Sequence, residues 1–213
     1  MMIPVKEMHE FVRAGGPEPE QYEALTHTLG AFNLLERRGE FDQYGPDFKE
    51  DLMGKSLTFD TMQGFAYRKP HGHSGDFELI ERICGGYQTT NQKLEKWDAF
   101  WSQQAFVEAI QNSQQYFKHT MQELECVNSQ AKVLNIASGS SRSVANYLSD
   151  VHSDASFLCM DNNWKALDYA KLLCRNYSHQ VKFQHGSVSE LNAVTLFDLV
   201  WSEGLFDYLN EQP

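Results

Sequence analysis

A bend of small residues follows an apolar run in the second half of the chain. Residues 133–136 read Val-Leu-Asn-Ile, residues 137–141 read Ala-Ser-Gly-Ser-Ser, and a helical pattern begins at Arg142. Small side chains let a ligand lie against the backbone at the carboxyl end of a strand, beside the start of a helix. The next apolar run ends in Asp161, whose carboxylate can accept hydrogen bonds from both hydroxyls of a ribose. The pattern therefore predicts a nucleoside site.

The single glycine in this bend bears on which nucleoside would bind. A dinucleotide and S-adenosylmethionine both present a ribose to the second strand, so Asp161 alone does not separate them. A dinucleotide-binding turn needs the pattern G-x-G-x-x-G, whereas residues 137–142 read Ala-Ser-Gly-Ser-Ser-Arg. A pyrophosphate would meet a crowded loop, and the methionine part of S-adenosylmethionine needs less room. The bend favours S-adenosylmethionine over a nicotinamide cofactor, which leaves a nicotinamide-dependent oxidoreductase as the disfavoured alternative.

Short apolar runs alternate with amphipathic helices after about residue 128, as in a parallel sheet with crossover helices. Strands are expected at residues 132–137, 156–160, 181–184 and 196–201, with helices at 142–151 and 164–175. The fold class is therefore predicted as α/β, with a Rossmann-like parallel sheet over residues 128–213.

Residues 1–127 have helical periodicity instead. One helix is expected around Tyr22 to Phe32, and a longer aromatic-rich helix from Trp97 to Leu124. The segment between them has loop character over residues 69–76, followed by a helical turn at 77–83. We expect residues 1–127 to form a helical cap or substrate region, with the aromatic residues Trp97, Phe100 and Trp101 in its core.

Four segments in the same order resemble the landmarks of class I S-adenosylmethionine-dependent methyltransferases. Residues 133–142 are similar to motif I, Asp161 occupies the second-strand position, residues 186–188 follow the third strand, and residues 197–204 are similar to motif IV. The chain departs from motif I where Asn135 replaces an acid and where Ala137 and Ser141 replace glycines. The cofactor contacts that the resemblance implies are Asn135, Ala137, Ser138, Gly139, Arg142, Asp161, Asn162, Ser187, Val188 and Ser202.

Each of these roles has a plainer alternative. Asp161 could cap the helix that follows it, and Ser187 could be an ordinary loop residue. Glu203 follows the fourth strand, where the family places groups that face the methyl donor. We predict that Glu203 is a catalytic residue that orients the substrate or accepts a proton, and the alternative is an exposed loop acid.

A narrower resemblance lies upstream. Residues 69–77, Lys-Pro-His-Gly-His-Ser-Gly-Asp-Phe, are similar to a K-P-x-G-Y-x-G-D-Y segment of a bacterial subgroup that includes methyltransferases of 3-hydroxy fatty acid methyl ester biosynthesis. Residues 204–209 resemble the continuation of motif IV in that subgroup, and His73 and Phe77 depart from its pattern. The resemblance implies a small-molecule acceptor such as a fatty acid carboxylate, with His73, Gly75 and Asp76 in a lid or substrate loop.

Composition excludes several other classes. There are 18 Lys+Arg against 29 Asp+Glu, and a net charge of -11 would repel a phosphate backbone, so no nucleic acid partner is expected. The four cysteines lack zinc-site spacing, and His71, His73 and Asp76 are read as loop residues, so no metal is expected. The N-terminus has no signal-peptide pattern, and no apolar run approaches the roughly 18 residues of a membrane span. A cytoplasmic protein is the expectation.

The favoured function is transfer of a methyl group from S-adenosylmethionine to a small molecule, with catalysis mainly from proximity and alignment. Because the predicted sheet stops after its fourth strand, it would leave an unpaired apolar edge. We therefore expect a fragment of a longer protein, or a homo-oligomer or partner chain that covers this edge. The departures from motif I keep a second function open, a non-catalytic module that binds S-adenosylmethionine or S-adenosylhomocysteine.

Overall fold

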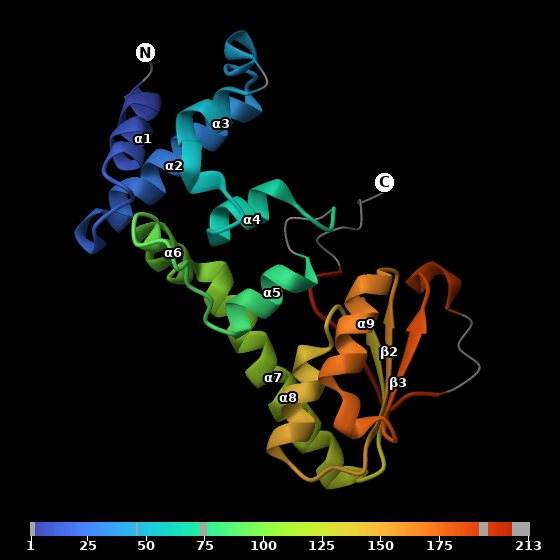
Figure 1. The fold of residues 1–213 in the computed structure, drawn as a ribbon. Helices are drawn as coiled ribbons and strands as arrows, with labels where there is room; N and C mark the ends of the chain where they lie inside the picture. Colours follow the sequence, from blue (N-terminus) through green and yellow to red (C-terminus); the bar gives the residue numbers. More distant parts are fainter. Residues whose placement is uncertain (1–2, 46, 73–75, 192–195, 206–213) are drawn as a thin grey trace. The chain divides into compact units, whose positions relative to one another are not determined.

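A computed structural model describes residues 3–45, 47–72, 76–191 and 196–205 (Figure 1). The chain divides into two compact units, residues 1–108 and 109–213. The division falls inside helix α7 (Ala105–Val127), whereas the predicted boundary after residue 127 lies at the carboxyl end of that helix.

Helices make up the first unit. In chain order they are α1 (Ile3–Arg13), α2 (Tyr22–Arg37), α3 (Phe48–Met53), α4 (Met62–Arg68), α5 (Phe77–Cys84), α6 (Glu95–Ser102) and the start of α7, with short 3-10 turns at Pro19–Gln21, Asp42–Tyr44 and Gly54–Leu57. The apolar faces of α1, α2, α3 and α6 meet in one core, whose most buried members include Met8, Leu25, Trp97 and Phe100. The expected core positions of Trp97 and Phe100 are confirmed, whereas Trp101 is only partly buried and lies outside this core.

Buried polar groups fix how these helices begin. Thr61 caps α4 by accepting a hydrogen bond from the Gly64 amide over 3.0 Å. Asp98 accepts from the backbone amides of Met62 and Thr89 over 2.8 and 2.7 Å, although its side chain is almost fully buried. A Cβ at position 64 would lie 2.0 Å from the Thr58 carbonyl oxygen, so α4 can approach that segment only through glycine.

The prediction of a single helix from Trp97 to Leu124 is wrong, because two helices occupy this segment. Helix α6 ends at Ser102 and α7 begins at Ala105. The Gln103 amide donates back to the carbonyls of Phe100 and Trp101, which closes the last turn of α6. The apolar spacing continues across this break, so periodicity alone predicted one helix.

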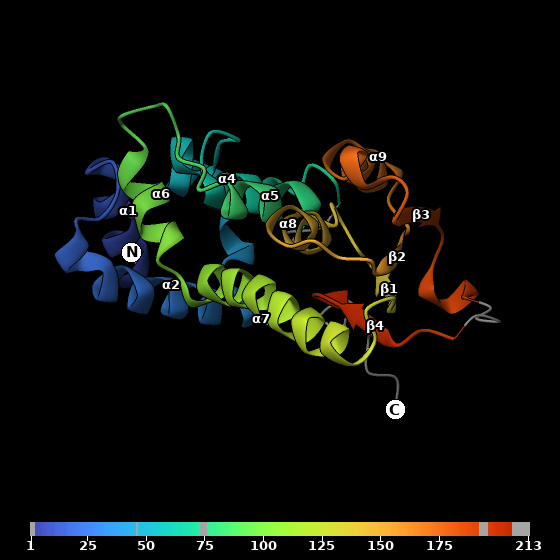
Figure 2. The same cartoon turned by 90° about the horizontal axis from the view of Figure 1, so that it is seen from below.

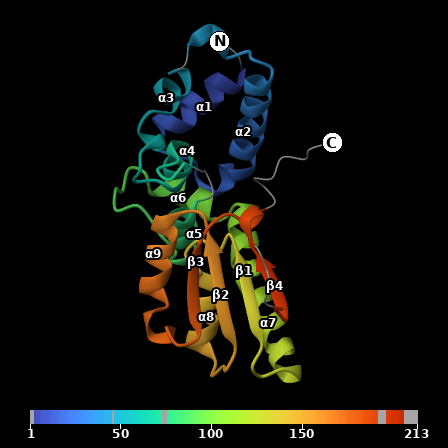
Figure 3. The same ribbon diagram turned by 90° about the vertical axis from the view of Figure 1, so that its right-hand side faces the viewer.

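Four parallel strands form the sheet of the second unit in the described part of the chain. They are β1 (Lys132–Ile136), β2 (Ser156–Asp161), β3 (Val181–His185) and β4 (Leu199–Ser202), in the order β3-β2-β1-β4 (Figure 3). Helices α8 (Arg142–Asp150) and α9 (Trp164–Leu173) follow β1 and β2, and short 3-10 turns lie at Arg175–Tyr177 and Val188–Glu190. The predicted Rossmann-like α/β class, with helices preceding a parallel sheet, is confirmed.

One face of this sheet carries the main core of the unit. Val133, Phe157 and Val181 are in register across three strands and pack with residues of α7 and α8, including Phe117, Val144 and Tyr147. Figure 2 views the strands nearly end-on, with α7, α8 and α9 on this side. Among the described residues, β4 pairs with β1 alone, and Val200 is 57% exposed.

Candidate functional site

The bend after β1 is held in an unusual backbone conformation. Ala137, Gly139 and Ser141 all have positive φ, at 51°, 52° and 54°. Left-handed backbone costs a residue with a Cβ roughly 1–2 kcal/mol, and such strain gathers at functional sites. Ala137 and Ser141, which carry this cost, stand where the sequence lacks the motif's glycines. The bend is also tied to its surroundings, because the Ser138 amide donates to the Met160 carbonyl over 3.0 Å.

Asp161 ends β2 and faces this bend. Its Oδ2 accepts a hydrogen bond from the Gly139 amide over 2.8 Å, and its Oδ1 accepts from the Asn163 amide over 2.8 Å. Helix α9 is capped by the Asn163 side chain, which accepts from the Lys165 amide, so Asp161 is not the capping residue of that helix. A carboxylate has about four acceptor positions. These two backbone amides occupy two of them.

Two aromatic rings stack beside Asp161. Trp164 and His185 lie parallel, with centroids 4.0 Å apart and planes 6° apart, and the indole is 58% exposed. The imidazole Nε2 lies 3.0 Å from the Asn162 carbonyl oxygen, which joins the ends of β2 and β3. Sequence reasoning missed this pair, because the two residues are far apart in the chain and neither belongs to a motif.

The residues after β3 shape their own turn. Ser187 accepts from the Ser189 amide, and its own amide donates to Glu190 Oε2, a capping box around the short turn that contains Val188. The Gly186 amide donates to the Asp161 carbonyl over 3.0 Å. Ser187 is thus a capping residue, and contacts of Ser187 and Val188 with an adenine stay a prediction.

Glu203 is anchored at the end of β4. Its Oε1 accepts hydrogen bonds from the Ser143 hydroxyl over 2.7 Å and from the Trp201 indole over 2.8 Å. The side chain is partly buried, so it is not the exposed loop acid of the plainer alternative. The contact with Ser143, in the first turn of α8, could not be seen in the sequence.

Three hydroxyls at this edge are buried without a hydrogen-bond partner among the described residues, those of Ser138, Ser141 and Ser202. Ser202 pairs with Ile136 in the register of β4 on β1, two residues before Ser138. Because buried polar groups are normally hydrogen-bonded, such orphans point to an absent ligand or water. They fit a polar ligand at the bend.

The remaining predicted contacts lie on either side of the bend. Asn135 is buried within β1, opposite Cys159 and Trp201, whereas Arg142 is the first residue of α8. Burial raises the pKa of the Cys159 thiol in the neighbouring strand β2 to about 12. The predicted site residues therefore lie in the carboxyl-terminal parts of the four strands or in the segments that directly follow them. These segments are residues 135–142, 161–162, 187–188 and 202–203.

The predicted lid residues belong to the first unit. His73 and Gly75 lie outside the described residues, and Asp76 caps α5 by accepting from the amides of Glu78 and Leu79, each over 3.0 Å. His71 Nε2 lies 2.8 Å from Glu78 Oε2. No group of three potential metal ligands occurs in the parts of the chain that are described.

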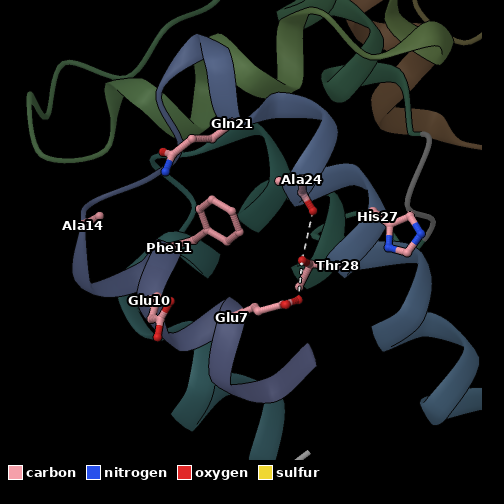
Figure 4. Close-up of a pocket in the computed structure, with 8 residues that line it drawn as sticks. All are labelled: Glu7, Glu10, Phe11, Ala14, Gln21, Ala24, His27 and Thr28. Atoms are coloured by element: carbon pink, nitrogen blue, oxygen red, sulfur yellow. Dashed lines mark hydrogen bonds between the residues drawn. The ribbon is translucent and has the colours of Figure 1, made fainter. Parts of the chain in front are cut away.

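The first unit also has hollows of its own. One lies between α1 and α2, where Glu7, Glu10 and Gln21 lie around the Phe11 ring, and the Thr28 hydroxyl lies near Glu7 and the Ala24 carbonyl (Figure 4). A second is apolar and is lined by Leu29, Phe32 and Phe106 among others, and a third adjoins it around Lys49 and Arg68. Across the described residues, no helix is both long and apolar enough to cross a membrane.

Comparison with known proteins supports the fold. No family model matches the chain, and no curated protein matches it. A possible exported protein from Bordetella parapertussis is 15% identical with a TM-score of 0.58, over 95% of this chain and 58% of that protein. This chain therefore spans 58% of the length of that structure.

Two further solved structures are less similar. A methyltransferase from Thiobacillus denitrificans in complex with S-adenosyl-L-homocysteine is 21% identical with a TM-score of 0.35, over 42% of this chain and 36% of that one. Coclaurine N-methyltransferase bound to N-methylheliamine and S-adenosyl-L-homocysteine is 12% identical with a TM-score of 0.42, over 95% of this chain and 54% of that one.

Proposed function

We propose that this chain is an S-adenosylmethionine-dependent methyltransferase, or the cofactor-binding part of one. The observation that carries the proposal is the link between the strained bend and Asp161, with the amide of Gly139 donating to the carboxylate over 2.8 Å. Strain in a bend of small residues at the carboxyl end of a parallel strand is expected where a nucleoside binds. The motif resemblance of the same residues supports S-adenosylmethionine as the cofactor.

The proposed contacts follow from the chemistry of the edge. Asp161 would hold the ribose through its two remaining acceptor positions. The orphaned hydroxyls of Ser138 and Ser202 would meet the polar methionine end. The exposed Trp164 side chain would contact the adenine, as would Ser187 and Val188. S-adenosylmethionine supplies an activated methyl group, and the protein's part is to align it with an acceptor and to exclude water.

The acceptor we propose is a small molecule with a carboxylate, such as a fatty acid. A carboxylate is already a nucleophile, so no strong base is required. Glu203 would then act by orientation, since its Oε1 already accepts hydrogen bonds from Ser143 and Trp201. We also propose that His73, Gly75 and Asp76 belong to a lid or substrate loop. For the whole protein we propose a cytoplasmic location, and a further segment, second copy or partner chain that covers the edge of β4.

A second candidate is a module that binds the cofactor without turnover. The observation that favours it is the presence of side chains at Ala137 and Ser141, with φ of 51° and 54°, where the family has glycine. Residues with a Cβ hold this left-handed backbone at a cost that glycine would not have. This candidate shares the cofactor with the first and differs only in catalysis.

Isothermal titration of the full natural protein with S-adenosylmethionine, S-adenosylhomocysteine and NADH tests the proposal. We expect both sulfur nucleosides to bind and NADH not to bind. Failure of both to bind would remove both candidates, and NADH binding alone would favour the oxidoreductase. Transfer of a labelled methyl group to fatty acids then separates the enzyme from the binding module.

A further inference from the structure

An apolar pocket lies inside the helical first unit. Its volume is about 340 Å³, and its wall includes Leu29, Phe32, Met53, Leu57, Phe100 and Phe106. Ligand pockets commonly measure ~300–1,000 Å³ and are mainly apolar with a few placed polar groups. Several wall residues, such as Phe32 and Phe100, are buried core members. The wall is therefore part of the folded core and is formed before any ligand arrives.

A second hollow adjoins the apolar pocket. Asn33, Lys49 and Tyr67 line both of them, so the two hollows meet at these residues. The adjoining hollow carries four basic side chains, Arg37, Lys49, Arg68 and Lys69, and two acidic ones, Glu36 and Glu50. A locally basic groove is notable in a chain with a net charge of -11.

Ion pairs account for part of this basic charge. Lys49 Nζ lies 2.5 Å from Glu36 Oε1, and Arg68 lies 3.6 Å from Glu50 Oε2. No acidic partner of Arg37 or Lys69 is found among the described residues. Lys49 lines both hollows and its side chain is 26% exposed, so it lies where the apolar pocket meets the basic hollow. A carboxylate at this point would be attracted by the excess of basic groups.

We propose that this pocket binds an amphiphile with a single apolar chain and an anionic head, the chain against the apolar wall and the head beside Lys49. The proposal that an amphiphile binds is argued from the pocket alone. The proposal that this amphiphile is the methyl acceptor rests on the proposed function. Lys49 would be a specificity-determining residue, because it distinguishes an anionic head from a neutral one.

Titration calorimetry on the full chain with octanoate, decanoate and 1-decanol tests the pocket. Each added methylene that is buried should tighten binding about fourfold until the pocket is full. Replacing Lys49→Met should weaken decanoate about tenfold and leave 1-decanol unchanged, whereas a general loss of structure would weaken both. Lys6→Met is the matched control, because Lys6 is exposed on α1 and is not among the residues that line these pockets.

A variant that fills the pocket tests whether decanoate and 1-decanol bind there and not elsewhere on the protein. Asn33 is exposed on α2 at the junction of the two hollows, so Asn33→Trp should exclude both ligands while the far-ultraviolet circular dichroism stays unchanged. Decanoate binding that survives in a folded Asn33→Trp protein, or no binding to the wild-type chain, would overturn the pocket. A parallel titration with S-adenosylhomocysteine reports on the proposed function separately, since its contacts lie in the other unit.

Discussion

The backbone amide of Gly139 donates a hydrogen bond to Asp161 Oδ2 over 2.8 Å, so one carboxylate both shapes the bend after β1 and ends β2. Its other oxygen accepts from the Asn163 amide. Removing the carboxylate would therefore release the bend as well as any ribose contact.

Asp161→Ala should lower the affinity for S-adenosylhomocysteine at least tenfold, because the ribose loses its acceptor and the bend loses its tie. Hydrogen bonds to charged groups contribute about 1.5–3 kcal/mol each, which supports this magnitude. Asp168→Ala is the matched control, since Asp168 is exposed on α9 and pairs with Lys171. Titration calorimetry measures both, and equal affinity in the two variants would contradict the proposed ribose contact.

Glu203→Ala should destabilise the second unit by about 1–3 kcal/mol, because the Ser143 hydroxyl and the Trp201 indole lose their common acceptor. Glu203→Gln keeps an acceptor oxygen and should cost less. Urea unfolding followed by tryptophan fluorescence compares the three proteins. If both variants were as stable as the wild type, the anchoring role of Glu203 would be wrong.

Ala137→Gly should raise stability by about 0.5–1 kcal/mol. Left-handed backbone costs alanine roughly 1–2 kcal/mol, and the extra freedom of unfolded glycine offsets part of that gain. The φ of Ala137 is 51°. Ala145→Gly, in the middle of α8, is the control and should destabilise instead. Midpoints of urea unfolding check the signs, and a loss of stability in Ala137→Gly would count against the strained bend.

Asp98 should give a pH dependence of stability with a defined sign. Burial raises the pKa of its carboxyl, and the amides of Met62 and Thr89 only partly oppose this. The folded state therefore binds the proton more tightly than the unfolded state, whose pKa is about 3.9. The stabilisation that comes from this tighter proton binding is fully present below that value. It is lost as pH rises through the pKa of Asp98 in the folded state.

Asp98→Asn provides the comparison, because asparagine does not titrate. The stability of the wild type minus that of the variant should fall as pH rises from about 4 to 7. Urea unfolding of both proteins at several pH values measures the difference. A difference that is constant or grows with pH would contradict the raised pKa.

The thiols should react in an order set by burial. Burial raises the pKa of Cys159 to about 12 and that of Cys174 to about 11, with Arg142 opposing the second shift, so neither forms an appreciable thiolate at pH 8. Cys126 is exposed. Iodoacetamide followed by peptide mass spectrometry should label Cys126 first and the two buried thiols only after unfolding. Early labelling of Cys159 in the folded protein would contradict its burial.

The sequence predicted the sheet better than the helical unit, for physical reasons. A buried parallel strand is a short apolar run bounded by polar residues, and β1 and β2 end within one residue of their expected limits. Strand β4 begins three residues later than expected, at Leu199, because Leu196 is apolar yet 91% exposed. Helix α1 was not expected, since charged residues interrupt its apolar positions Val5 and Met8.

The site was only partly predictable. Motif spacing indicated Gly139 and Asp161 because the order of strands brings their positions together. The contact between Ser143 and Glu203 and the stack of Trp164 on His185 arise from tertiary folding, and no local pattern encodes them. The apolar pocket was hidden for the same reason, since its lining comes from helices that are separated along the chain.

The positions of two tryptophans would give the two proposed binding events separate fluorescence signals. The chain has four tryptophans, of which Trp101 lines the apolar pocket and Trp164 stacks beside Asp161. Proteins that retain only one of these two emitters would separate amphiphile binding from nucleoside binding without any label. The order in which two ligands arrive could then be followed by comparing the stopped-flow emission of the two proteins.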